Sequence, residues 1–203
     1  MENKLISTIY DKYGNTAFTN IICYSLSILD KNEYKIINIV NCIQSYLNKR
    51  FNLELNIENV YIICIYMYNS SKIIYDLPYM LDNIKKNGKP TLHIVYSETV
   101  VQLASISLMS ESLSLLKNIC DTHIQNGYNQ HKIYTILLDN TDYKQPSIFT
   151  NNNKEDLLTM YDKMIDSLFK KCIKICIYCY SDYIDDIDDI YNIISNIISN
   201  III

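Results

Sequence analysis

Residues 60 to 68 read Val-Tyr-Ile-Ile-Cys-Ile-Tyr-Met-Tyr, an unbroken run of apolar and tyrosine side chains without a single charge. β-Branched and aromatic residues favour extended structure, and the run shows no alternation between apolar and polar positions. Such a run is typical of a strand that is covered on both faces, as in a parallel sheet. We therefore predict a buried strand at these residues.

Three further runs of similar composition follow along the chain, at residues 91–97, 132–139 and 172–181. The longer segments between the runs carry helix signals, such as Gly88 with Pro90 just beyond it, which would end a helix. Strands that alternate with helices predict right-handed crossovers and a parallel sheet. The predicted fold class is therefore α/β, a four-stranded mainly parallel sheet with helices on both faces and a helix-rich N-terminal segment.

A single globular domain over residues 1–203 is expected, with an N-terminal segment at 1–58 and the α/β core at 59–203. Within the first segment, Glu33 to Leu47 predicts an amphipathic helix, because its apolar residues recur on one face. The residues around Gly14 leave two alternatives open for the start of the chain: a hairpin of two strands, or a break between two helices.

A second long helix is predicted between Ser97 or Thr99 and Gly127. Its apolar residues surround most of its circumference, so it is expected to be buried on more than one side. It is either central to the fold or in part a contact between subunits.

Composition excludes several classes of protein. The chain has 18 Lys+Arg against 22 Asp+Glu, a net charge of -4, and Arg50 is its one arginine, which argues against a nucleic-acid partner. The sequence has no stretch of about 20 apolar residues, so no membrane-spanning helix is predicted. The seven cysteines lie mostly inside apolar runs, which predicts reduced thiols in a core and a cytoplasmic protein. The surplus of Ile, Asn, Lys and Tyr is typical of an AT-rich genome.

Acidic residues follow three of the four predicted strands. In parallel sheets ligands bind beyond the carboxyl ends of the strands, so these acids would converge at one edge and hold Mg²⁺. The residues of this predicted metal site are Glu98, Asp139, Asp142 and Asp182. The alternative is that they are ordinary caps of the helices that follow.

The densest acidic cluster is Asp185-Asp186-x-x-Asp189. It resembles the magnesium-binding acidic motif of prenyl-transferring synthases. That resemblance implies a large all-helical bundle and a second such motif. The sequence holds no second copy, and the runs above predict a sheet, so we interpret the acids as the solvated start of a helix.

These patterns lead to two hypotheses for function. The chain has three histidines and no phosphate-binding loop or nucleophile motif, so no catalytic residue or cofactor site is assigned. The first hypothesis is a non-catalytic cytosolic interaction or regulatory protein, homo-oligomeric or a subunit of a larger assembly, with no cofactor. The alternative is a Mg-dependent hydrolase of a phosphorylated or nucleotide-like small molecule, in which Lys72 or Lys144 would neutralise phosphate.

Overall fold

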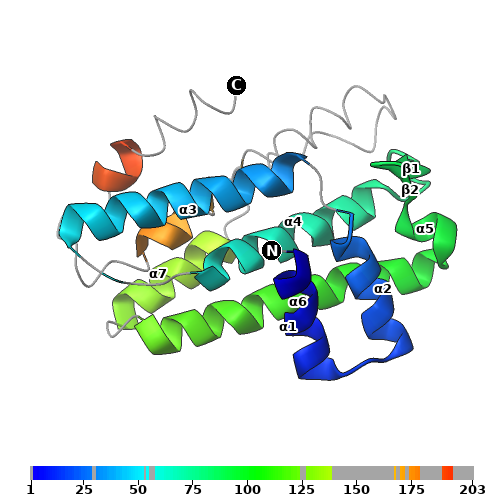
Figure 1. The fold of residues 1–203 in the computed structure, drawn as a ribbon, viewed down its shortest axis with the longest axis horizontal. Coiled ribbons are helices and arrows are strands. Elements are labelled where there is room, and N and C mark those ends of the chain that lie inside the picture. The colour runs from blue at the N-terminus through cyan, green and yellow to red at the C-terminus, as the bar shows by residue number, and fades with distance from the viewer. Residues whose placement is uncertain are drawn as a thin grey trace.

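The computed structural model describes residues 2–28, 31–52, 54, 58–123, 127–138, 167, 170–171, 174–178 and 189–193. Over these residues the chain is a bundle of helices with one small antiparallel sheet at its end (Figure 1). The elements are α1 (Glu2–Tyr13), α2 (Ala17–Leu26), α3 (Lys31–Phe51), α4 (Glu58–Tyr75), β1 (Lys85–Lys86), β2 (Lys89–Pro90), α5 (Leu92–Val95), α6 (Glu98–His123) and α7 (Gly127–Leu138). The predicted α/β fold with a four-stranded parallel sheet is therefore wrong.

The run from Val60 to Tyr68 lies wholly inside α4. Every residue from Val60 to Ser70 is buried, so α4 is enclosed by protein on all sides. A helix buried all round and a strand covered on both faces have the same unbroken apolar pattern, and its period does not separate them. The prediction that this run is buried is therefore confirmed, and the prediction that it forms a strand is wrong.

The other three predicted strands are helical over most of the residues that the structure describes, and none of those residues forms a strand. Thr91 precedes the short helix α5, residues 132–138 belong to α7, and residues 174–178 are helical. The remainder of the run at 172–181 lies outside the described residues. Tyr, Ile and Cys have only a weak intrinsic preference for strands, and packing against neighbouring helices overrides it.

Helices α4 and α6 form the central pair of the bundle, and α3 packs on the other side of α4 (Figure 1). Two serines let α4 and α6 approach closely. The Ser105 hydroxyl lies 3.1 Å from the Ser70 hydroxyl and donates to the Ser70 carbonyl at 2.7 Å. A small side chain at each point of contact, with its hydroxyl hydrogen-bonded, removes the steric and polar obstacles to this packing.

The two long helices predicted from the sequence are confirmed. The helix expected at Glu33–Leu47 is α3, which extends further at both ends. The helix expected after Ser97 is α6, and the Ser97 carbonyl accepts the first helical hydrogen bond from Val101 at 3.0 Å. Helix α6 contacts α2, α4 and α5, which agrees with the expectation of burial on more than one side, but Leu103 and Ile106 are 50% and 63% exposed, so one apolar face is open.

Within the described residues, one helical stretch, Glu98–Thr122, is long and apolar enough to cross a membrane by length and composition. The mean hydropathy of its most apolar window is 1.3, and 39% of that window is buried in the bundle. The core helix of a soluble protein passes the same test. The prediction of no membrane partner stays a prediction.

The N-terminal alternative is resolved in favour of helices. Gly14, between α1 and α2, has a φ of 70°, a conformation that residues with a side chain seldom adopt. Thr16 then begins α2 with a reciprocal cap: the Thr19 amide donates to the Thr16 hydroxyl at 3.1 Å, and the Thr16 amide donates to the Thr19 hydroxyl at 2.8 Å. Helices α1 and α2 therefore form a tight helical hairpin beside α6.

A buried ionic cluster joins α3 to α4. The Lys72 ammonium lies 3.1 Å from the Glu33 carboxylate, and the side chains are 5% and 0% exposed. The Asn69 amide donates to the same carboxylate oxygen. Charges this deep need such partners, because the desolvation of an unpaired ion costs several kcal/mol.

Four of the described cysteines are buried, as expected for thiols that act as small core residues. They are Cys23, Cys64, Cys120 and Cys176, while Cys42 is exposed. Burial raises the pKa of Cys120 to about 11, which keeps this thiol protonated at neutral pH.

Candidate functional site

The acids of the predicted sheet-edge site are not brought together in the described part of the chain. Glu98 is exposed at the first position of α6, where its charge complements the helix dipole. Asp139, Asp142 and Asp182 lie outside the described residues. The described residues contain no parallel sheet at whose edge these acids could meet. Their grouping into a metal site therefore stays a prediction, without the sheet from which it was derived.

A small polar pocket lies where α4 meets the β1–β2 hairpin and α5. Its volume is about 20 Å³, roughly the space of one water molecule. His93 lines it with a side chain that is 4% exposed, and the His93 Nε2 atom has no hydrogen-bond partner and lies 3.7 Å from an Asp82 carboxylate oxygen. The pocket is too small to enclose an organic ligand.

The described residues do not fit a magnesium site of the kind that the acidic motif implies. Among them, no group of three or more His, Cys, Asp or Glu side chains lies close enough to hold a metal ion. Near the small pocket, Asp76 accepts a hydrogen bond from the Asn83 amide at 2.8 Å and Asp82 faces His93. Asp185 and Asp186 lie outside the described residues.

A much larger cavity lies between the α1–α2 hairpin and α6. Its volume is about 370 Å³, within the range of about 300–1,000 Å³ that is usual for small-molecule sites. Apolar lining residues come from each helix: Ile9 from α1, Phe18 and Ile22 from α2, and Leu108 from α6. Phe18 is the most exposed of them, and the other three are buried. The remaining lining residues are polar: Tyr13, Thr16, Thr19, Ser107, Ser110 and Glu111.

Helical spacing explains why these residues share a cavity. Leu108 and Glu111 are three residues apart on α6, and Phe18 and Ile22 are four apart on α2, so each pair lies on one face of its helix. Phe18 is 37% exposed, so the cavity is open to solvent on the side of α2. The cap at Thr16 and Thr19 fixes the start of α2 and therefore the shape of that side.

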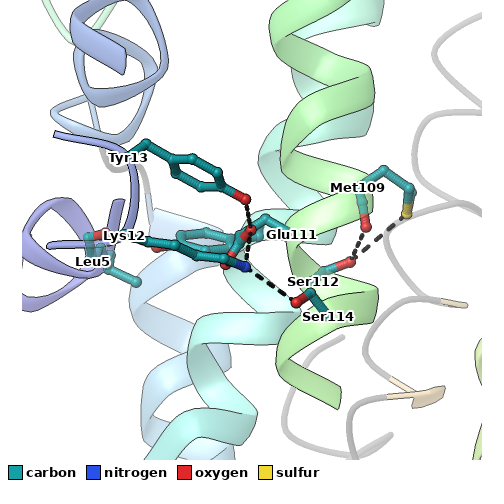
Figure 2. A network of polar contacts seen from close by, with 8 residues as sticks. Leu5, Lys12, Tyr13, Met109, Glu111, Ser112 and Ser114 are labelled. Atoms are coloured by element: carbon teal, nitrogen blue, oxygen red, sulfur yellow. Dashed lines mark hydrogen bonds and ion pairs between the residues drawn. The ribbon is translucent and has the colours of Figure 1, made fainter. Parts of the chain in front are cut away.

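A polar network lies at the cavity wall, and Figure 2 shows Lys12 and Tyr13 reaching from α1 to Glu111 on α6. The Lys12 ammonium donates to both Glu111 oxygens at 2.9 Å and to the Ser114 hydroxyl at 3.1 Å. The Tyr13 hydroxyl donates to Glu111 Oε2 at 2.6 Å. The Glu111 side chain is 4% exposed, and that of Lys12 is 41% exposed. A buried acid is thus held at the cavity wall by partners from another helix.

The network shifts the titration of its members. The hydrogen bond to Glu111, together with burial, raises the pKa of Tyr13. Burial opposes the charge of Lys12, but its hydrogen bonds to Glu111, together with the nearby Tyr13 side chain, outweigh this and raise the pKa of the ammonium. Lys12 is therefore charged and Tyr13 neutral at physiological pH, as the donated hydrogen bonds require.

Sequence reasoning missed this cavity, although one signal was available. Glu111 is the one acidic residue between Glu98 and Asp121 in a helix that is otherwise apolar or rich in serine. An isolated acid in a helix predicted to be buried requires a partner, since ionised carboxylates are rarely buried alone. The partners Lys12 and Tyr13 are about a hundred residues away, and no local pattern identifies them.

No family model matches the chain, and no curated protein matches it. Solved structures do match. An isoprenoid synthase family member from Thermotoga neapolitana has a TM-score of 0.64 and 17% identity, over 96% of this chain and 72% of the other. A geranyltranstransferase from Thermotoga maritima has a TM-score of 0.57 and 15% identity, over 93% of this chain and 69% of the other. The chain therefore has a fold similar to that of isoprenoid synthases.

This likeness corrects the functional hypotheses drawn from the sequence. The prediction of a non-catalytic interaction or regulatory protein is contradicted, because the fold is similar to that of enzymes named for isoprenoid synthesis. The alternative hypothesis of a Mg-dependent hydrolase is also contradicted, because it was derived from a parallel sheet that the described residues lack. A protein partner or self-association, the absence of a nucleic-acid partner and the cytoplasmic location stay predictions.

Proposed function

We propose that the chain binds an isoprenoid in the cavity between α1, α2 and α6. The observation that carries the proposal is the cavity itself, about 370 Å³ with apolar lining residues from each of three helices. The likeness to isoprenoid synthases over 96% of the chain supports the same ligand class. A branched hydrocarbon chain matches walls of Ile, Leu and Phe, because its affinity comes from apolar area removed from water.

The size of the ligand sets the expected affinity. At about 0.8 kcal/mol for each buried methylene-sized group, a chain of about ten carbons gains roughly 8 kcal/mol. Association costs about 4 kcal/mol or more, which leaves about 4 kcal/mol or less and a dissociation constant of about 1 mM or weaker. Geraniol, the ten-carbon isoprenoid alcohol, is therefore a suitable first probe.

The test is calorimetric titration of the protein with geraniol. Ser107→Leu places a larger apolar side chain at a half-buried position of the cavity wall, and leucine is compatible with the α6 helix. It should weaken geraniol binding by about tenfold or more, because it occupies ligand volume. Asn118→Leu is the matched control, since Asn118 is exposed on the same helix and does not line the cavity. Saturable binding that Ser107→Leu leaves unchanged would place the ligand elsewhere and refute the proposal.

A further inference from the structure

The charge of the cavity lining restricts the head group of the ligand. Among the described residues that line the cavity, Glu111 is the only one with a formal charge, and that charge is negative. The nearest cation, Lys12, directs its ammonium to both Glu111 oxygens and to Ser114, so its three N–H donors are occupied. An anionic head group would thus meet a carboxylate with no uncommitted ammonium donor from Lys12.

The hydrogen-bonding capacity of the network also favours an uncharged head group. An ionised carboxylate has about four lone-pair positions. Glu111 accepts two hydrogen bonds from Lys12 and one from Tyr13, and Oε1 receives only one of the three. The Tyr13 hydroxyl donates its proton to Oε2, so its oxygen remains able to accept. A group that both donates and accepts, without charge, completes this network.

We propose that the cavity selects a neutral isoprenoid alcohol over isoprenoid anions, with Glu111 as the residue that sets this specificity. The inference rests on the proposed function, because it names the head group of the isoprenoid in the same cavity. The alcohol donates to Glu111 Oε1, and its chain lies among Ile9, Ile22 and Leu108. A carboxylate or a diphosphate in the same position would be repelled by the negative charge of Glu111, whose side chain is itself only 4% exposed.

Three ten-carbon ligands test the inference: geraniol, geranic acid and geranyl diphosphate, titrated without divalent cations at neutral pH. The wild-type protein should bind geraniol about tenfold or more tightly than either anion. Glu111→Gln removes the charge and keeps the shape, so the preference should fall to about twofold or less by the same reasoning. Asp121→Asn is the control, because Asp121 is an exposed acid on the same helix, paired with Lys117 outside the cavity, and should leave the preference unchanged.

A second variant keeps the test decisive if Glu111→Gln does not fold. Lys12→Met removes the cation and leaves Glu111 in place, so the preference for geraniol over geranic acid should increase. The outcomes separate the two proposals. Saturable geraniol binding with equal or tighter binding of an anion overturns the head-group inference and leaves the isoprenoid cavity standing. Absence of binding by all three ligands overturns the cavity itself.

Discussion

Two Lys–Glu pairs each join a pair of helices, and they differ in where the lysine lies. In the pair between α3 and α4, Glu33 and Lys72 are 0% and 5% exposed. In the pair between α1 and α6, Glu111 is 4% exposed but Lys12 is 41% exposed, and the acid lines a cavity of about 370 Å³. The same ionic chemistry is therefore a sealed structural contact in one region and part of the wall of a cavity in the other.

The largest effect is expected in the sealed pair. Lys72→Met leaves Glu33 buried without its ammonium partner, so it should lower the free energy of unfolding by about 3–5 kcal/mol. Urea denaturation measures this loss. Lys117→Met is the control, because the Lys117 and Asp121 side chains are 66% and 53% exposed and such pairs contribute about 0–1 kcal/mol. Equal losses in both variants would show that burial does not distinguish the two kinds of pair.

A smaller effect is expected at the cavity. Glu111→Gln keeps hydrogen-bonding capacity, and the half-exposed Lys12 can turn to water. The free energy of unfolding should therefore fall by about 1–2 kcal/mol. The same denaturation experiment compares it with Lys72→Met. A loss as large as that of Lys72→Met would contradict the distinction between a sealed pair and a cavity-wall pair.

The smallest effect is a change in alkaline sensitivity. The folded state raises the pKa of both Lys12 and Tyr13. Their contribution to stability is therefore present below their unfolded pKa values of about 10 and is lost as pH rises through the folded values. A Lys12→Met, Tyr13→Phe double variant should lose less stability than wild type between neutral and strongly alkaline pH. Denaturation at a series of pH values tests this, and parallel curves for the two proteins would contradict it. Cys23 and Tyr66, whose pKa values burial also raises, remain in both proteins and account for the shared decline.

Burial was more predictable from the sequence than the type of element. The amphipathic helix at Glu33–Leu47 and the long helix after Ser97 have a helical period or end signals, and both are present. The run from Val60 to Tyr68 has no apolar period that separates a helix from a strand, and in the structure it lies in a helix packed against α2, α3 and α6. Interpreting this run as a strand predicts a sheet. The resemblance of Asp185-Asp186-x-x-Asp189 to the acidic motif implies an all-helical fold instead, so the two predictions conflict.

The binding cavity was not predictable from local patterns. Glu111 stands out as an isolated acid in an apolar helix, but its partners Lys12 and Tyr13 lie on α1, about a hundred residues earlier in the chain. The cavity exists because the α1–α2 hairpin leaves space beside α6, which depends on the turn at Gly14 and on tertiary packing. Long-range geometry of this kind has no signature within a short window of sequence.

The most direct measurement of the central claim is a set of nuclear Overhauser effects between geraniol and isoleucine methyl groups in methyl-labelled protein. Ile9 and Ile22 line the large cavity, and Ile28 and Ile73 line the small pocket at the end of α4, so the two sites have matched reporters. We predict contacts from geraniol protons to the methyl groups of Ile9 and Ile22. Saturable binding of geraniol without contacts to Ile9 and Ile22 would contradict the account, whether or not Ile28 and Ile73 show contacts.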